Sequence, residues 1–184
     1  MKFKRREMLA ASGAGLVGSM MLAQQAQAAA VEAGHAGNTG TPYQPVRTLN
    51  GWSLPYTLKD GVKEFHLIAE EFEHEFAPGM TAKCWGYNGT TPGPTIEAVE
   101  GDRVRIYVTN ALKEHTTIHG HGLLLPSGMD GVGGLNQPHI KPGETFVYEF
   151  DLKQHGTHMY HPHGDEMVQM AAGMMGMFII HPRK

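Results

Sequence analysis

Cysteine is almost absent from this sequence of 184 residues, in which Cys84 stands alone. No disulfide can therefore form within the chain, which excludes the class of small exported domains that are stapled by disulfides. Cys84 also has no histidine among its immediate neighbours. We expect it to be a small buried residue packed in a strand rather than a thiolate ligand of copper.

Long uninterrupted apolar runs are also missing. The apolar stretch at residues 8–23 is broken by Ser and Gly and is shorter than a bilayer requires. Because four basic residues precede it and Ala26-Gln27-Ala28 follows it, residues 1–28 are predicted to be a secretory signal. The pair Arg5-Arg6 is similar to that of a twin-arginine signal, which predicts export of the folded protein to the periplasm and no membrane anchor after cleavage.

The sequence also has no excess of positive charge. The net charge is −3, and it falls to about −6 without residues 1–28. This balance argues against nucleic acid and against anionic membrane surfaces as partners. About 156 residues remain after the signal, enough for one domain with a hydrophobic core.

The remaining chain has two parts. Residues 29–58 are rich in Ala, Gly, Thr and Pro, which predicts a flexible arm. Residues 59–184 contain short alternating segments such as Val104, Ile106 and Val108, separated by turn sequences, with no helical period. We therefore predict an all-β Greek-key sandwich. The alternation changes phase between residues 65–69 and 72–76, which predicts one long strand with a bulge.

Two histidine pairs carry the strongest chemical signal, namely His119-Gly120-His121 and His161-Pro162-His163. Residues two apart in a strand share a face, so each pair is expected to present two imidazoles on one side, with His115 and Thr117 on the face of the first pair. Four imidazoles without thiolates suit several first-row metals, with copper the first choice in an exported protein and zinc the second.

The motifs around these pairs resemble the first cupredoxin domain of bacterial multicopper oxidases, the laccase and copper-resistance oxidase family. The resemblance covers nearly all of residues 60–182. It differs from the usual family pattern at Gly120, Met159 and Pro162, none of which is a ligand. The matching segments are Trp85-Gly86-Tyr87-Asn88-Gly89, Pro92-Gly93-Pro94-Thr95-Ile96, Gly101-Asp102, Ile118-His119-Gly120-His121-Gly122, Asp130-Gly131, Pro142-Gly143, residues 156–163 and Gly173-Met174-Met175-Gly176.

The resemblance implies that this domain supplies half of a trinuclear copper cluster. By position, His119 is similar to a ligand of the type 2 copper, and His121, His161 and His163 are similar to ligands of the type 3 pair. Asp130 matches an acid that assists proton delivery during dioxygen reduction. The family's other ligands, including a His-Cys-His stretch, are not in this sequence, so we expect a carboxy-terminal cupredoxin domain to supply them in cis or in trans.

Two functions remain open at this stage. In the first, the chain is the amino-terminal domain of a periplasmic oxidase that couples oxidation of a phenolic or cuprous reductant to reduction of dioxygen to water. In the second, it is a stand-alone module that carries or buffers copper without catalysis. The methionines at positions 167, 170, 174, 175 and 177 could bind Cu(I), but packing in the core and in a turn is the favoured interpretation.

Overall fold

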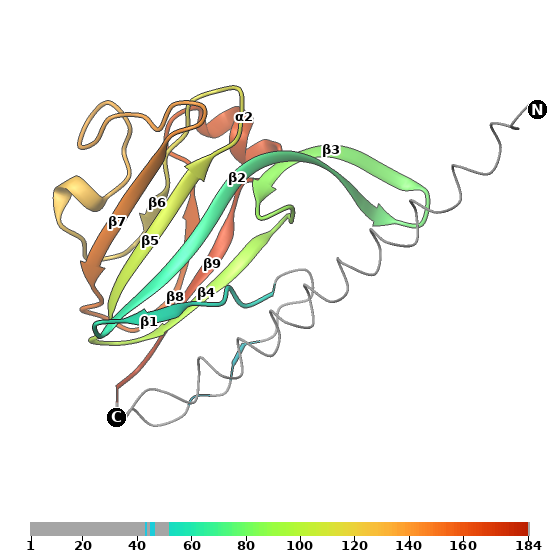
Figure 1. The fold of residues 1–184 in the computed structure, drawn as a ribbon. Helices are drawn as coiled ribbons and strands as arrows, with labels where there is room; N and C mark the ends of the chain where they lie inside the picture. The colour runs from blue at the N-terminus through green and yellow to red at the C-terminus, as the bar shows by residue number, and fades with distance from the viewer. Residues whose placement is uncertain (1–42, 44, 47–51, 184) are drawn as a thin grey trace, which may run out of the picture. The chain divides into compact units, whose positions relative to one another are not determined.

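The computed structural model describes residues 43, 45, 46 and 52–183, and the signal predicted for residues 1–28 lies outside them. These residues fall within one compact unit of the chain, residues 39–184. Figure 1 shows two layers of strands packed face to face. Within the described part, no helix has the length and apolar character needed to cross a membrane. The predicted all-β, cupredoxin-like sandwich is confirmed.

Each layer of the sandwich is one sheet. The first has the order β1-β2-β5-β7, with β3 paired to β2, and the second has the order β4-β9-β8-β6. Their strands are β1 (Thr57–Lys59), β2 (Val62–Ala77), β3 (Met80–Tyr87), β5 (Arg103–Asn110) and β7 (Thr145–Asp151) in the first sheet, and β4 (Gly93–Val99), β6 (His119–His121), β8 (Gly156–His161) and β9 (Gly176–His181) in the second.

The core lies between the two sheets because each strand turns its alternate apolar side chains inward. Phe65 and Leu67 of β2 are buried there, together with Val104 of β5. Ile96 of β4 and Phe178 of β9 face them from the second sheet and are equally buried. Strands β2 and β5 run parallel, as do β4 and β9, so connections cross between the layers as a Greek-key arrangement requires.

Strand β2 is continuous across the change of phase, so the bulge predicted between residues 69 and 72 is wrong. The only register shift between β2 and β3 lies further along, between Glu75 and Ala77. Ala69 forms the last pair of β2 with β5. Beyond this residue β2 pairs only with β3, and the two strands leave the sandwich as the ribbon seen in Figure 1. The hydrophobic pattern changes because the ribbon has no second sheet to face.

Two further expectations need correction. A short helix, α2 (Glu166–Ala171), follows β8, and a 3-10 turn, η1 (Ser127–Met129), lies in the loop before β7, although the sequence predicted no helix after the signal. The segment at residues 52–58 was expected to end a flexible arm, but Leu54 is buried in the core and Trp52 packs against it. The short helices and the packing of residues 52–58 depend on contacts with parts of the chain that are distant in sequence, which a local pattern does not reveal.

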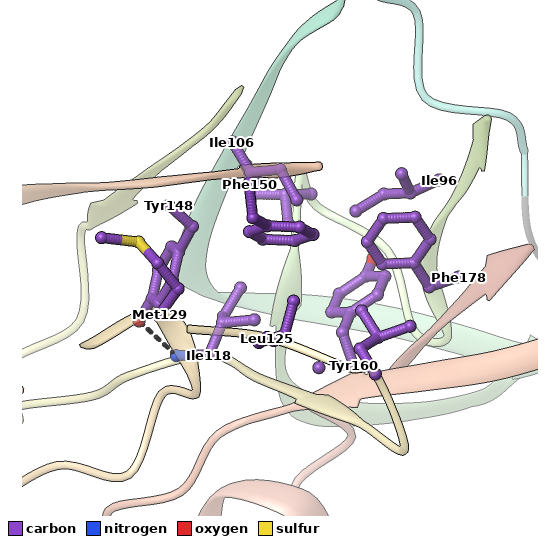
Figure 2. A pocket seen from close by; sticks show the side chains of 12 residues that line it. Ile96, Ile106, Ile118, Leu125, Met129, Tyr148, Phe150, Tyr160 and Phe178 are labelled. Carbon is purple, nitrogen blue, oxygen red and sulfur yellow. Dashed lines mark hydrogen bonds between the residues drawn. The ribbon is translucent and has the colours of Figure 1, made fainter. Parts of the chain in front are cut away.

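An apolar cavity of about 20 Å³ lies between the sheets directly under β6. Gly120 faces it, and a side chain at this position would meet Leu123 and Leu125, which occupy the space below the strand. Figure 2 shows the ring of Tyr148 among the side chains around this cavity. The Tyr148 hydroxyl accepts a hydrogen bond of 3.0 Å from the Ile118 N–H, so this polar group is satisfied. Leucines thus fill the space beneath Gly120.

Candidate metal centre

The first histidine pair forms strand β6. Because Gly120 points into the core, His119 and His121 point together to the outer face of the second sheet. Their ring centroids lie 5.5 Å apart. The predicted shared face is therefore present for this pair.

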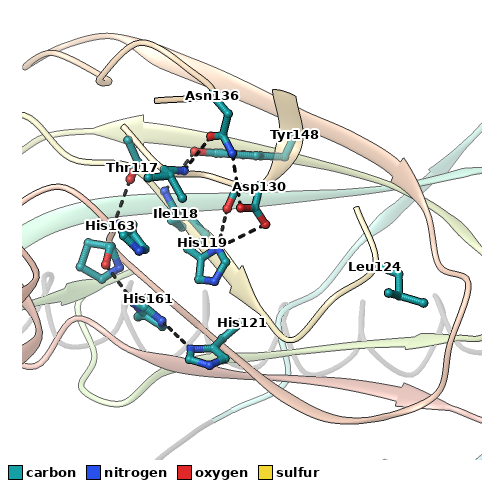
Figure 3. A network of polar contacts seen from close by, with 12 residues as sticks. Thr117, Ile118, His119, His121, Leu124, Asp130, Asn136, Tyr148, His161 and His163 are labelled. Atoms are coloured by element: carbon teal, nitrogen blue, oxygen red, sulfur yellow. Dashed lines mark hydrogen bonds and ion pairs between the residues drawn. The ribbon is translucent and has the colours of Figure 1, made fainter. Parts of the chain in front are cut away.

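The neighbouring strand brings His161 to the same place. In the ladder between β6 and β8, His161 lies directly opposite His119, and their ring centroids are 5.3 Å apart. His161 Nε2 also lies 3.0 Å from Nδ1 of His121. Ligand nitrogens of these three residues all fall within 4.8 Å of one another. Figure 3 shows the rings of His119, His121 and His161 lying together.

His163 lies beside this group rather than in it. Its ring centroid is 5.3 Å from that of His119 and 6.3 Å from that of His161. Strand β8 ends at His161 because Pro162 has no N–H with which to continue the ladder. The expected strand therefore stops short of His163, but the two imidazoles of this pair still lie together, because each ring centroid is 5.3 Å from that of His119.

Two hydrogen bonds fix the backbone of His163 where the strand has ended. The His163 N–H donates to the Thr117 hydroxyl at 3.1 Å, and the His163 carbonyl accepts from the Gly133 N–H at 3.3 Å. Thr117 is fully buried, so this attachment is shielded from water. The residue is consequently positioned by the loop at residues 122–137 and by the segment before β6.

Hydrogen bonds to backbone carbonyls determine the tautomers of two rings. A carbonyl can only accept, so Nδ1–H of His119 donates to the Asp130 carbonyl at 2.5 Å, and Nδ1–H of His161 donates to the Pro162 carbonyl at 2.9 Å. Both rings then keep a lone pair on Nε2, the state needed for a metal ligand. Burial lowers the pKa of His161, which favours this neutral form.

The His121–His161 contact follows from this arrangement. Because Nε2 of His161 has no proton, Nδ1–H of His121 is the donor across the 3.0 Å that separate them. Each of the two rings can give a lone pair to the same ion only if His121 moves its proton to Nε2. Binding of one ion between His121 and His161 therefore replaces their hydrogen bond with two coordination bonds.

Asp130 lies against His119 as the sequence suggested. Its carboxylate Oδ1 is 3.6 Å from His119 Nδ1, and Oδ2 accepts a hydrogen bond of 3.3 Å from the Asn136 side chain. The Asp130 side chain is 35% exposed, so it touches both the cluster and solvent. Gly131 follows with a φ of +85°, and a Cβ there would collide with the Ile118 carbonyl. Only glycine allows the loop to come this close to the strand.

Glu166 is a residue that the sequence analysis did not single out. At the start of α2, its Oε1 lies 3.6 Å from Nδ1 of His161 and 3.5 Å from Nε2 of His163. One carboxylate therefore contacts both histidines of the second pair. The sequence did contain one signal for Glu166, its position three residues after His163. Side chains three residues apart can meet where a helix begins.

The other candidates lie away from the three convergent rings. The ring of His115 packs at a tilt of 56° against that of His139, with centroids 4.2 Å apart, so His115 does not join the face of the first pair as expected. Cys84 is buried, as predicted, with 5% of its surface exposed. Of the five methionines expected to pack, Met174 is fully buried and Met167 is 88% exposed.

The donor set fits a first-row metal ion. Two imidazole nitrogens that each lie about 2 Å from one ion, at about a right angle, are separated by about 3 Å. The 3.0 Å between His121 Nδ1 and His161 Nε2 matches this separation without movement of the backbone. A set of imidazole ligands, with no thiolate and no cluster of carboxylates among the direct ligands, suits both copper and zinc.

Comparison with known proteins resolves this choice. The multicopper oxidase family model matches residues 69–184. The chain belongs to the multicopper oxidase family. Membership makes copper, rather than zinc, the cofactor of this domain.

Individual relatives agree with the family assignment. Copper resistance protein A of Escherichia coli is 45% identical over 97 residues, which cover 53% of this chain and 16% of that protein. The copper resistance protein A homolog of Pseudomonas syringae pv. tomato is 38% identical over 136 residues, or 72% of this chain and 23% of that one. The crystal structure of a multi-copper oxidase from Pseudomonas thermotolerans superimposes with a TM-score of 0.65 at 37% identity, over 67% of this chain and 30% of that one.

Proposed function

We propose that this chain is the amino-terminal copper-binding domain of a periplasmic multicopper oxidase. His119, His121, His161 and His163 supply half of the ligands of a trinuclear copper cluster. The complete enzyme reduces dioxygen to water while it oxidises a phenolic or cuprous reductant. The observation that carries the proposal is the convergence of three imidazoles within 4.8 Å on one sheet face of a domain that belongs to this family.

The residues of this chain hold the cluster and manage its protons. Copper supplies the electron transfer and the binding of dioxygen. Hydrogen bonds from Nδ1–H to backbone carbonyls orient the rings of His119 and His161. Each ring therefore keeps its Nε2 lone pair for a metal ion. Asp130 extends from solvent to His119 and passes protons inward. Glu166 holds His163 beside the group through their 3.5 Å contact.

A second domain is required by this proposal. Four histidines cannot saturate three copper ions, and the chain spans only 16% and 23% of the two curated relatives named above. A further cupredoxin domain, in cis or in trans, supplies the remaining ligands and the copper at which electrons enter. The periplasm is the proposed location, because residues 1–28 have the sequence of an export signal.

Oxygen consumption tests the proposal directly. Copper-loaded chain alone should consume no oxygen, with a phenolic or cuprous reductant, above the rate of free copper. Addition of a carboxy-terminal cupredoxin domain, fused or in trans, should give turnover. Oxidase activity of the isolated chain would contradict the half-site. If the two-domain protein is fully loaded with copper and still inert, the chain is a copper carrier.

A further inference from the structure

Three residues form a row across the outer face of the second sheet. In the ladders, His121 lies directly opposite Met159, and Met159 lies directly opposite Met177. Residues directly opposite in antiparallel strands have Cβ atoms about 4.5–5.5 Å apart and share a face. The row therefore begins at the histidine cluster and crosses β6, β8 and β9.

These methionines are not core residues. Their neighbours Tyr160 and Phe178 point inward and are buried, so Met159 and Met177 point outward. Both are half-buried, and His121 is exposed. Met174, by contrast, has no exposed surface. The packing interpretation that suits Met174 does not account for two adjacent methionines on the outside of the sheet.

Thioether pairs have a defined metal preference. Methionine sulfur is a soft and uncharged ligand that selects Cu(I) over hard cations, and its unbranched chain can adjust to meet an ion. Two side chains that start about 5 Å apart and each extend over three rotatable bonds can bring both sulfurs to one ion. An imidazole nitrogen is a compatible third donor.

His121 can provide that third donor. In its hydrogen bond to His161, the proton of His121 is on Nδ1, which leaves a lone pair on Nε2. We propose that Met159 and Met177, with His121 as third donor, form a site for a soft monovalent cation, Cu(I), beside the imidazole cluster. The site shares His121 with the half-cluster of the proposed function, but it uses Nε2 of that ring rather than the Nδ1 that faces His161, and its other two ligands are sulfur atoms outside the cluster.

Silver ion is a suitable probe because it is monovalent, soft and redox-inert. The copper-free chain, with 13C-labelled methionine methyl groups, is titrated with Ag⁺ and followed by NMR. The signals of Met159 and Met177 should shift together and saturate at one equivalent. Met159→Leu and Met177→Leu conserve side-chain volume, and each should weaken Ag⁺ binding about tenfold or more while leaving Cu²⁺ binding unchanged. Met167→Leu, at a methionine that is 88% exposed on α2, is the matched control and should bind Ag⁺ like the wild type.

A second variant separates this site from the cluster. His119→Ala/His163→Ala should lose Cu²⁺ affinity and keep the Ag⁺-induced shifts of Met159 and Met177. If both leucine variants bind Ag⁺ as tightly as the wild type, or if the two methyl signals do not respond, the proposal is wrong. Weak Cu²⁺ binding by the wild-type chain would instead count against the half-cluster alone.

Discussion

Nδ1 of His121 lies 3.0 Å from Nε2 of His161, although 40 residues separate the two histidines in the sequence. They are diagonal neighbours, because the residue directly opposite His161 in the ladder is His119. Side chains of this length reach diagonally across a pair of strands. The register between β6 and β8 therefore sets which nitrogen atoms can share an ion.

His121→Ala should lower copper affinity by about tenfold or more, because it removes one of the three convergent imidazoles. His121 is exposed, so the β fold should remain intact by circular dichroism. Calorimetric titration with Cu²⁺ measures the effect. His155→Ala is the control. The His155 ring is exposed and lies away from the cluster, with its Nδ1 3.3 Å from the Glu100 carboxylate. Wild-type affinity in His121→Ala would exclude His121 as a ligand.

Asp130→Asn should lower turnover of the two-domain oxidase roughly a hundredfold, because an amide cannot relay a proton. Copper content should not change, since it is the Asp130 backbone carbonyl that orients His119. Steady-state oxygen consumption and metal analysis give the two readouts. Asp151→Asn, at an exposed carboxylate on β7, provides the control. Equal loss of copper and activity would mean that Asp130 holds the site together instead.

Asp102→Ala should destabilise the fold by about 3–5 kcal/mol, because it leaves the buried Lys63 ammonium without its partner. The two groups are 2.6 Å apart, and only 2% and 7% of their side chains are exposed. Urea unfolding measures the change. Glu71→Ala breaks the exposed pair with Lys113, at 3.9 Å, and should alter stability by less than about 0.5 kcal/mol. Similar effects of the two substitutions would show that burial does not govern these pairs.

Glu149→Gln should produce a stability difference that depends on pH. Hydrogen bonds from Arg105 and Arg103 lower the pKa of Glu149 below its ordinary value of 4.5. The ionised carboxylate therefore stabilises the folded protein fully above pH 4.5, and this contribution is lost as the pH falls through the lowered pKa. The free energies of unfolding of wild type and variant should converge on acidification. A difference that stays constant down to the lowest pH would contradict the assignment.

The sequence alone determined the fold class, the copper ligands as candidates and the likeness to multicopper oxidases. Period-two alternation at Val104, Ile106 and Val108 is a local signal, because each strand must turn one face to the core. The turn at Asn88-Gly89 is also a local signal: both residues have positive φ, at 54° and 68°, which asparagine tolerates and glycine, with no side chain, adopts freely. The His119 pair needed only the strand period to be placed on one face.

The tertiary structure alone decided the register and everything that depends on it. Register brings Nδ1 of His121 to Nε2 of His161, places Met159 between His121 and Met177, and sets Glu166 against two histidines. No local pattern specifies which residue of β6 lies opposite which residue of β8, because these strands are some 35 residues apart and are aligned by the packing of buried faces and by the loop at residues 122–137. Strand β8 ends at His161, two residues before His163, because Pro162 has no N–H to donate to a neighbouring strand.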